Sequence, residues 1–252
     1  MANEHIFDHR AGNYSQGRPG YADGVTRLIF DRLLVPGGTV VDVGSGTGIF
    51  ARIFLERGVR VVCVEPNAGM RAQADELFRG DPNYVSVAAS AEATGLPDGC
   101  VDLMTAASAY HWFDPDAFAA ECRRVLRPDG VFLAVMNCRD YRDPFTLRQH
   151  ELCRRFCPSF SSLRHGMETS EPRLRRLFGD SFRQELFDFP LTYQKERFVA
   201  RSLSSSYAPD PDTLAAAEYA AALRTLMDEF APGSDRITVP NLTAAYWGRP
   251  QL

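Results

Sequence analysis

Residues 39–49 read TVVDVGSGTGI, and this stretch decides the fold. Its first five residues are rich in β-branched side chains and follow a Pro-Gly-Gly turn, a pattern typical of a buried strand. Three alternating glycines, Gly44, Gly46 and Gly48, come next, and the apolar spacing over 49–57 predicts a helix. Because glycine has no Cβ atom, the backbone of such a turn can come close to a ligand. The stretch therefore predicts a strand, a ligand-binding loop and a helix in that order.

The sequence on the carboxyl side of this stretch continues to alternate strand-like and helical patterns. The predicted strands are 59–64, 84–88, 101–107 and 131–136, and the predicted helices are 69–78 and 115–126. Strands that read as continuous apolar runs between helix-length patterns indicate a parallel sheet that is covered on both faces. We therefore expect an α/β fold with a doubly wound, Rossmann-like, mostly parallel sheet, in which the loops after the first four strands carry the chemistry.

A carboxylate at the end of the second predicted strand complements the glycine loop. Glu65 follows Gly48 by 17 residues, and an acidic residue near this spacing can accept hydrogen bonds from both hydroxyls of a ribose. The pair therefore indicates adenosine recognition. A dinucleotide fingerprint, Gly-x-Gly-x-x-Gly, would need a third glycine at position 49, where this chain has Ile49. That departure disfavours a nicotinamide cofactor.

Composition and charge narrow the classes of function. The 252 residues include 28 basic and 32 acidic side chains, so a net charge of -4 disfavours a nonspecific nucleic-acid binder. No apolar run approaches the ~18 residues of a membrane-spanning helix. The first ten residues mix charged and aromatic side chains, so no secretion signal is expected. Six cysteines without a Cys-x-x-Cys pair favour a reduced, cytoplasmic setting and predict no metal site.

Four segments of the chain together resemble the class I S-adenosylmethionine-dependent methyltransferases. They are VVDVGSGTG at 40–48, VEPN at 64–67, SAEATGLPDGCVDLM at 90–104 and RRVLRPDGVFLAV at 123–135, and they occur in the family's order and spacing. Two further segments, FDHRAGNYSQGRPGY at 7–21 and AYHWFD at 109–114, are similar to the small-molecule branch that includes trans-aconitate methyltransferase-like enzymes. The resemblance implies S-adenosyl-L-methionine as cofactor and S-adenosyl-L-homocysteine as product.

The resemblance also implies which residues hold the cofactor. Gly44 and Gly46 would lie against its methionine part, with Asp42 supporting the amino group, and Glu65 would hold the ribose. The loop that starts at Ser90 would lie along the adenine, with a backbone amide reading the ring. The family often has Asp where this chain has Ser90, and this departure disfavours recognition of the exocyclic amine by the side chain. The complete implied set is Asp42, Gly44, Ser45, Gly46, Glu65, Pro66, Asn67, Ser90, Ala91, Glu92, Ala107, Tyr14 and Arg18.

The reaction itself demands placement more than acid–base chemistry. Methyl transfer from a sulfonium is an in-line displacement, and good placement of the reacting groups can supply roughly 7–11 kcal/mol. His111 is the candidate base for a hydroxyl acceptor, or a positioning residue for a carboxylate, which needs no base at neutral pH. Aromatic faces suit a cationic cofactor, although ordinary packing explains such residues equally well. The candidate substrate contacts are Tyr110, Trp112, Tyr21 and Tyr207.

The predicted function is transfer of a methyl group to a small-molecule acceptor, at a carboxylate or hydroxyl oxygen, by a cytoplasmic enzyme that is a monomer or a homodimer. Nucleic acid and membrane are not expected partners. A regulatory or partner module that binds the cofactor without methyl transfer is the alternative outside enzymes, and an NAD(P)-dependent oxidoreductase is the alternative within them. Arginine clusters at 148–155 and 173–176 predict either solvated helix faces or contacts to an anionic substrate.

One domain over residues 1–252 is the expected organisation. A domain averages about 150 residues, so a chain of 252 residues fits one large domain or one domain with an insertion. Within the last part, strands are expected at 182–193 and 237–247 around a helix at 213–230, with Pro190 and Pro240 at strand ends or edges. The expected parts are a lid or helix at 1–34, the cofactor-binding core at 35–137, a helical cap insertion at 144–180, and strands and helices at 181–252 that complete the sheet.

Overall fold

The computed structural model describes residues 19–251, and these divide into two compact units. Unit 1 takes 19–137, 166–187 and 243–251, and unit 2 takes Cys138–His165 and Asp188–Leu242. The segment predicted as a cap, 144–180, is shared between the two units. The single domain over 1–252 stays a prediction.

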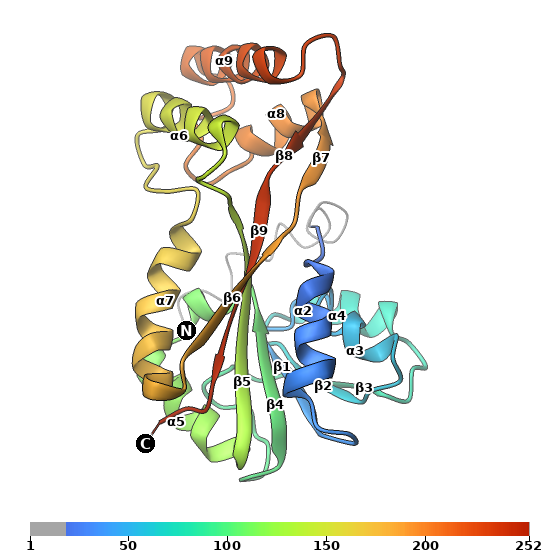
Figure 1. Ribbon diagram of the computed structural model, residues 1–252. Helices are drawn as coiled ribbons and strands as arrows, with labels where there is room; N and C mark the ends of the chain where they lie inside the picture. Colours follow the sequence, from blue (N-terminus) through green and yellow to red (C-terminus); the bar gives the residue numbers. More distant parts are fainter. Residues whose placement is uncertain (1–18, 252) are drawn as a thin grey trace. The chain divides into compact units, whose positions relative to one another are not determined.

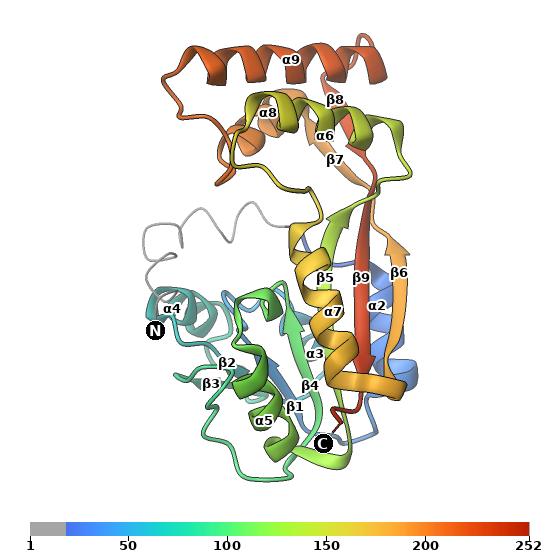
Figure 2. The same cartoon turned by 90° about the vertical axis from the view of Figure 1, so that its left-hand side faces the viewer.

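Unit 1 is built on a seven-stranded sheet with the strand order β3-β2-β1-β4-β5-β9-β6 (Figure 1). The neighbours β3, β2, β1, β4 and β5 pair in parallel, and the arrow of β9 runs opposite to that of β5 (Figure 2). The sheet confirms the predicted doubly wound, mostly parallel fold. The strands are β1 (Val40–Val43), β2 (Val61–Val64), β3 (Tyr84–Val87), β4 (Val101–Ala107), β5 (Leu126–Arg139), β6 (Arg183–Asp188) and β9 (Asn241–Gly248).

The register of the central strands places the expected ligand loops side by side. All four residues of β1 are buried, as a strand covered on both faces should be. Val43 at the end of β1 is in register with Val64 at the end of β2. The glycine loop and Glu65 therefore leave the same edge of the sheet from adjacent positions.

Helices cover both faces of this sheet, with α2 and α3 on one face and α5 and α7 on the other (Figures 1 and 2). The predicted helix at 49–57 forms only as α3, because turns that start at Gly48 and end at Gly58 occupy its two ends. The helical elements of unit 1 are α2 (Asp23–Leu28), η1 (Ile29–Leu33), α3 (Arg52–Leu55), α4 (Ala68–Leu77), η2 (Tyr110–Trp112), α5 (Pro115–Val125), η3 (Gly179–Ser181) and α7 (His165–Phe178), whose first residue falls in unit 2.

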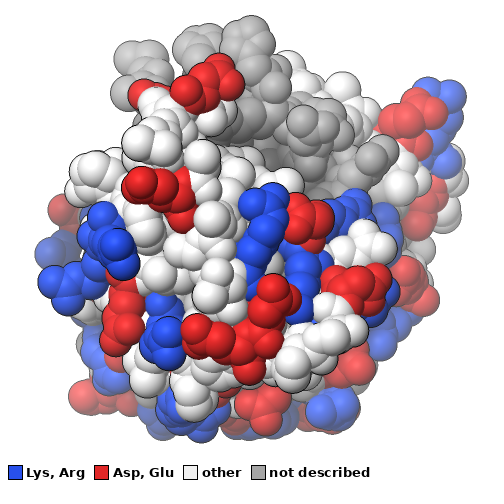
Figure 3. Space-filling view, turned by 90° about the horizontal axis from the view of Figure 1, so that it is seen from above, with Lys and Arg blue, Asp and Glu red and all other residues white. Residues whose placement is uncertain are grey.

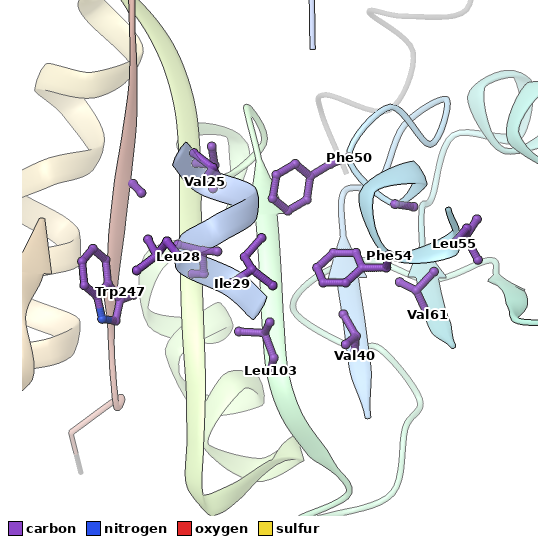
Figure 4. Packing of buried hydrophobic residues seen from close by; sticks show 14 of the residues in the cluster. Val25, Leu28, Ile29, Val40, Phe50, Phe54, Leu55, Val61, Leu103 and Trp247 are labelled. Atoms are coloured by element: carbon purple, nitrogen blue, oxygen red, sulfur yellow. The ribbon is translucent and has the colours of Figure 1, made fainter. Parts of the chain in front are cut away.

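The main core of unit 1 fills the space between α2, α3 and the sheet (Figure 4). Phe54 of α3 is fully buried there, and its ring packs against Phe30 and Phe50 at centroid distances of 6.0 and 5.9 Å.

We expect Phe54→Ala to lower the free energy of unfolding by about 3–5 kcal/mol, because the cavity adds to the lost burial. Urea unfolding checks this. Leu77→Ala, which truncates a half-exposed side chain, should cost far less, and equal losses would contradict this view of the core.

Unit 2 pairs a short antiparallel sheet with three helices. Two prolines explain why the predicted strands 182–193 and 237–247 were each too long: Pro190 and Pro240 interrupt them, because proline has no N–H to donate to a ladder. In each predicted strand, the segment before the proline therefore belongs to a different sheet from the segment after it. The elements are α6 (Pro144–Phe156), β7 (Leu191–Gln194), α8 (Lys195–Leu203), α9 (Leu214–Phe230) and β8 (Arg236–Val239).

Within residues 19–251, no helix combines the length and the apolar character that crossing a membrane would require.

Candidate functional site

The glycine loop after β1 adopts a backbone that only glycine accommodates easily. Gly44, Gly46 and Gly48 have φ angles of +63°, +58° and +82°. A Cβ atom on Gly44 would lie 2.7 Å from Cβ of Ala109, and one on Gly48 would lie 2.4 Å from the Phe78 ring. A Cβ atom on Gly46 would have Sδ of Met70 as its nearest neighbour among the described residues, at 3.8 Å. Two glycines thus permit close packing of the loop, and the middle one leaves room for a ligand.

Glu65 joins this loop to the helix that follows β2. The amide of Gly46 donates to Oε2 of Glu65 at 2.9 Å, and the amide of Asn67 donates to Oε1 at 2.8 Å. The side chain is only 7% exposed, and burial raises its pKa while the two amides oppose that rise. Each carboxylate oxygen can accept a second hydrogen bond. Glu65 is therefore held in place with acceptor capacity for two hydroxyl groups.

The neighbouring segment 65–67 is fixed from the helix side. Asn67 caps α4, since its Oδ1 accepts from the amide of Met70 at 2.9 Å. Arg71 donates to the carbonyl oxygens of Glu65 and Pro66 at 2.8 and 3.2 Å. On the loop side, the amides of Gly44 and Ser45 donate to the carbonyl of Val64 at 2.8 and 3.2 Å. The structure thus brings Gly44, Ser45, Gly46, Glu65, Pro66 and Asn67 together, as the sequence predicts.

Asp42 lies beneath the loop with one oxygen in use. Its Oδ1 accepts from the Thr105 hydroxyl at 2.7 Å, and its Oδ2 has no hydrogen-bond partner among the residues that the structure describes. The side chain is 1% exposed. Burial, reinforced by the charge of Glu65, raises the pKa of Asp42 to about 7, although the bond from Thr105 opposes the rise. A buried acceptor of this kind suits the ammonium group of a ligand.

The raised pKa of Asp42 predicts a pH-dependent stability. Because the folded-state pKa exceeds the ordinary aspartate value of 3.8, the native state loses stability as pH rises from about 4 to about 7. Between pH 5 and pH 7 we expect the free energy of unfolding of the ligand-free protein to fall by about 2–3 kcal/mol more than that of Asp42→Asn. Urea unfolding at several pH values measures the difference. Parallel profiles for the two proteins would refute the assignment.

The loop after β3 is held by a backbone bridge and by contacts to other segments. Ser90 and Ala93 form an isolated bridge, Ala91 is buried, and Oε1 of Glu92 accepts from the amide of Asp114 at 3.0 Å. The side chain of Glu92 is thus bound to the segment that begins α5. The adenine-binding role of Ser90, Ala91 and Glu92 stays a prediction.

Sequence reasoning missed the residue that anchors this loop from behind. Oε1 of the buried Glu121 accepts from both the amide and the hydroxyl of Thr94, at 2.8 and 2.6 Å. Arg124 pairs with the same carboxylate and, with Thr94, lowers the pKa of Glu121 to about 2. The available signal was an acidic residue on the buried face of a helix, which is rare without a partner.

Hydrogen bonds from the strand ends also hold residues 20–22 at the carboxyl edge of the sheet. Tyr21 donates to the hydroxyl of Ser108, directly after Ala107 ends β4, at 3.1 Å. Asn137 donates to the carbonyl of Gly20 at 2.9 Å, and its Oδ1 accepts from Thr243 at 2.6 Å. Ser108 has a φ of +54°, which is uncommon outside glycine. The Tyr21 hydroxyl is thus held at the residue that follows Ala107, whereas the predicted Tyr14 and Arg18 lie outside the described residues.

The short helix η2 carries three of the predicted substrate-site residues, and they differ in placement. Tyr110 is 2% exposed and packs against Phe118 and Phe132 at 5.7 and 5.8 Å, an arrangement that favours the packing alternative. Trp112 is 45% exposed, and its ring lies 4.9 Å from that of His111. A Cβ atom on Gly166 would lie 3.8 Å from Nδ1 of His111. The catalytic or positioning role of His111 stays a prediction.

Tyr207 belongs to unit 2, where its ring packs against Phe160 at 5.1 Å. Its predicted contact with substrate remains untested. The described residues contain no group of three or more His, Cys, Asp or Glu side chains arranged for a metal ion.

Three arginines of the clusters that the sequence singled out form ion pairs at the surface. Arg148 contacts Glu229 at 3.3 Å, and Arg175 contacts Glu171 at 2.8 Å. Arg176 pairs with Asp116. The space-filling view shows Lys and Arg side chains interspersed with Asp and Glu (Figure 3). For these three arginines the structure favours solvated helix faces over contacts to a substrate.

Comparison with known proteins gives matches to methyltransferases. The family model of the methyltransferase domain matches residues 41–134. An uncharacterized methyltransferase of Mycobacterium tuberculosis is 38% identical over 136 residues, 54% of each chain. An uncharacterized methyltransferase-like protein of Schizosaccharomyces pombe is 32% identical over 161 residues, 62% of each chain. The chain thus spans little more than half the length of the curated relatives it matches.

A solved structure matches over nearly the whole chain. A candidate type II methyltransferase of Anaeromyxobacter dehalogenans superposes with a TM-score of 0.69 at 27% identity, over 93% of this chain and 99% of that one. The narrower resemblance to the trans-aconitate branch stays a prediction. The glycine loop, Glu65 and the loop after β3 all fall inside residues 41–134, the part of the chain that matches the methyltransferase-domain family model, and this match supports the predicted class.

Proposed function

We propose that the chain transfers a methyl group from S-adenosylmethionine to a small-molecule acceptor, at a carboxylate or hydroxyl oxygen. The observation that carries the proposal is the position of Glu65, which bridges Gly46 and Asn67 at the glycine loop, where a Cβ atom on Gly46 would come no closer than 3.8 Å to another described residue. This is the edge of the sheet at which α/β folds bind nucleotides. The methyltransferase-domain match supports the choice of cofactor.

The residues present fit the cofactor at each end. Glu65 accepts the two ribose hydroxyls with its remaining lone pairs. Oδ2 of Asp42, which has no partner among the described residues, accepts from the ammonium of the methionine part. Gly46 lets that part approach the backbone. The bound cofactor supplies an electrophilic methyl group on a sulfonium.

The acceptor end of the site depends on η2 and the end of β4. His111 takes the proton of a hydroxyl acceptor, or positions a carboxylate that carries no proton. Trp112 offers an exposed aromatic face beside it. The resemblance of 7–21 and 109–114 to trans-aconitate methyltransferase-like enzymes supports a carboxylate acceptor.

A screen with methyl-labelled cofactor tests this function. Purified protein is incubated with labelled S-adenosylmethionine and fractionated metabolite extract, and we expect label in a low-molecular-weight product. Label released as methanol by mild alkali identifies a methyl ester and hence a carboxylate acceptor; label that is stable to alkali excludes an ester. Cofactor binding without transfer to any fraction would instead favour the regulatory or partner module.

The acceptor chemistry also decides the effect of His111→Asn. With a hydroxyl acceptor we expect kcat to fall by about 10²–10⁴-fold, because the general base is lost. With a carboxylate acceptor we expect a higher KM and a nearly unchanged kcat. Steady-state kinetics with the labelled product separates the two. Wild-type values of both constants would place His111 outside the site.

A further inference from the structure

An arginine of unit 2 is fixed in place by neutral groups. Arg139, the last residue of β5, donates to Oδ1 of Asn241 at 2.7 Å. Asn241 is itself held, because its amide donates to the carbonyl of Val239 at 2.8 Å. The guanidinium carbon lies 5.6 Å from the centroid of the fully buried Phe198 ring. The charged group is therefore positioned against the core of unit 2.

Arg139 has no carboxylate partner among residues 19–251. Its side-chain partners are the Asn241 amide and the Tyr193 hydroxyl, although a guanidinium has five N–H donors. The other groups that act on its charge are Arg201, which is a like charge, and Tyr207. Burial lowers the pKa of Arg139. A desolvated cation of this kind is costly until an anion pairs with it.

A second arginine lies in the same neighbourhood. The charges of Arg139 and Arg164 both act on the Cys138 thiol. Nε of Arg164 is buried and has no hydrogen-bond partner among the described residues. Asp140 also acts on this region, but Arg142 already holds its carboxylate, with contacts of 2.9 and 2.8 Å. The Asp140 carboxylate is thus already paired, and Nε of Arg164 remains a buried donor without an acceptor among the described residues.

We propose that unit 2 binds the oxyanion of a small organic molecule, a carboxylate or a phosphate, with Arg139 as the principal cation and Arg164 as the second. The planar fork of a guanidinium matches two oxygens of such an anion. The proposal concerns unit 2 alone, and its observations are independent of the proposed function. It applies the chemistry considered for the arginine clusters, contact to an anion, to two arginines outside those clusters.

Titration of the full chain with benzoate and with phenyl phosphate, at constant ionic strength, tests the proposal. Arginine Nε–Hε signals are followed by ¹⁵N NMR and assigned with Arg139→Lys and Arg164→Lys. We expect saturable shifts of the Arg139 and Arg164 signals, and binding at least tenfold weaker in Arg139→Gln. The matched control is Arg154→Gln, which removes the same charge from an exposed site of unit 2 and should change binding less than twofold.

The outcomes separate this inference from the proposed function. Saturable binding of either probe that depends on Arg139 supports the site, and a preference between the probes identifies a carboxylate or a phosphate. If Arg139→Gln fails to fold, Arg139→Lys replaces it, with at least fivefold weaker binding expected because the fork is lost. Absence of saturable shifts, or equal losses in Arg154→Gln, overturns the inference. Calorimetry with S-adenosylmethionine on the same samples reports on the proposed function alone.

Discussion

Replacing Gly44 by alanine is expected to lower the free energy of unfolding by about 2–5 kcal/mol. Part of the loss comes from the left-handed backbone, since φ is +63° at this position. The rest comes from contact, because the new methyl would lie 2.7 Å from Cβ of Ala109 and 3.3 Å from the Phe113 ring. Cβ of Ala109 is attached to backbone and cannot swing away. The displaced loop should also bind S-adenosylmethionine more weakly.

Gly58→Ala is the matched control for this substitution. Gly58 also has a positive φ, +67°, but no atom lies within 4 Å of the position its Cβ would take. Only the backbone penalty of about 1–2 kcal/mol should remain there. Denaturant unfolding of both variants measures the difference. Equal losses would show that the close approach of the loop to Ala109 has no energetic weight.

Glu65→Ala is expected to weaken S-adenosylmethionine binding by about 100-fold, since hydrogen bonds to a charged group contribute about 1.5–3 kcal/mol each and a ribose offers two hydroxyls. The same change leaves the amides of Gly46 and Asn67 without their acceptor, so the loop loses its internal support. Calorimetric titration of wild type and variant gives both affinities.

Two further variants show which contribution dominates. Glu65→Gln keeps one acceptor oxygen and removes the charge, so its affinity should lie between those of wild type and Glu65→Ala. Glu56→Gln removes a charge from an exposed position of the same unit and should leave the affinity unchanged. Wild-type affinity in Glu65→Ala would remove Glu65 from the ribose site.

The fold of unit 1 and the centre of the site could be predicted from the sequence because both depend on local patterns. The buried runs at 40–43 and 61–64 can only form interior strands, and parallel register then brings Glu65 to the glycine loop. Adjacent loops on one sheet edge follow from topology alone.

Other features depend on long-range packing that leaves little local trace. Tyr110 and Trp112 are neighbours in an aromatic segment, yet one is buried and the other exposed, because the turn of η2 directs them differently. The hydrogen bonds from Asn137 to Gly20 and from Arg139 to Asn241 join residues more than 100 positions apart in sequence. Pro190 and Pro240 marked strand ends correctly, but nothing local showed that each divides its strand between two sheets.

Calorimetric titration with S-adenosylmethionine and, separately, with NAD and NADP tests the central claim most directly. The arrangement of Asp42, Gly46 and Glu65 predicts micromolar binding of S-adenosylmethionine and none of the nicotinamide cofactors. Binding of NAD or NADP without binding of S-adenosylmethionine would contradict the account.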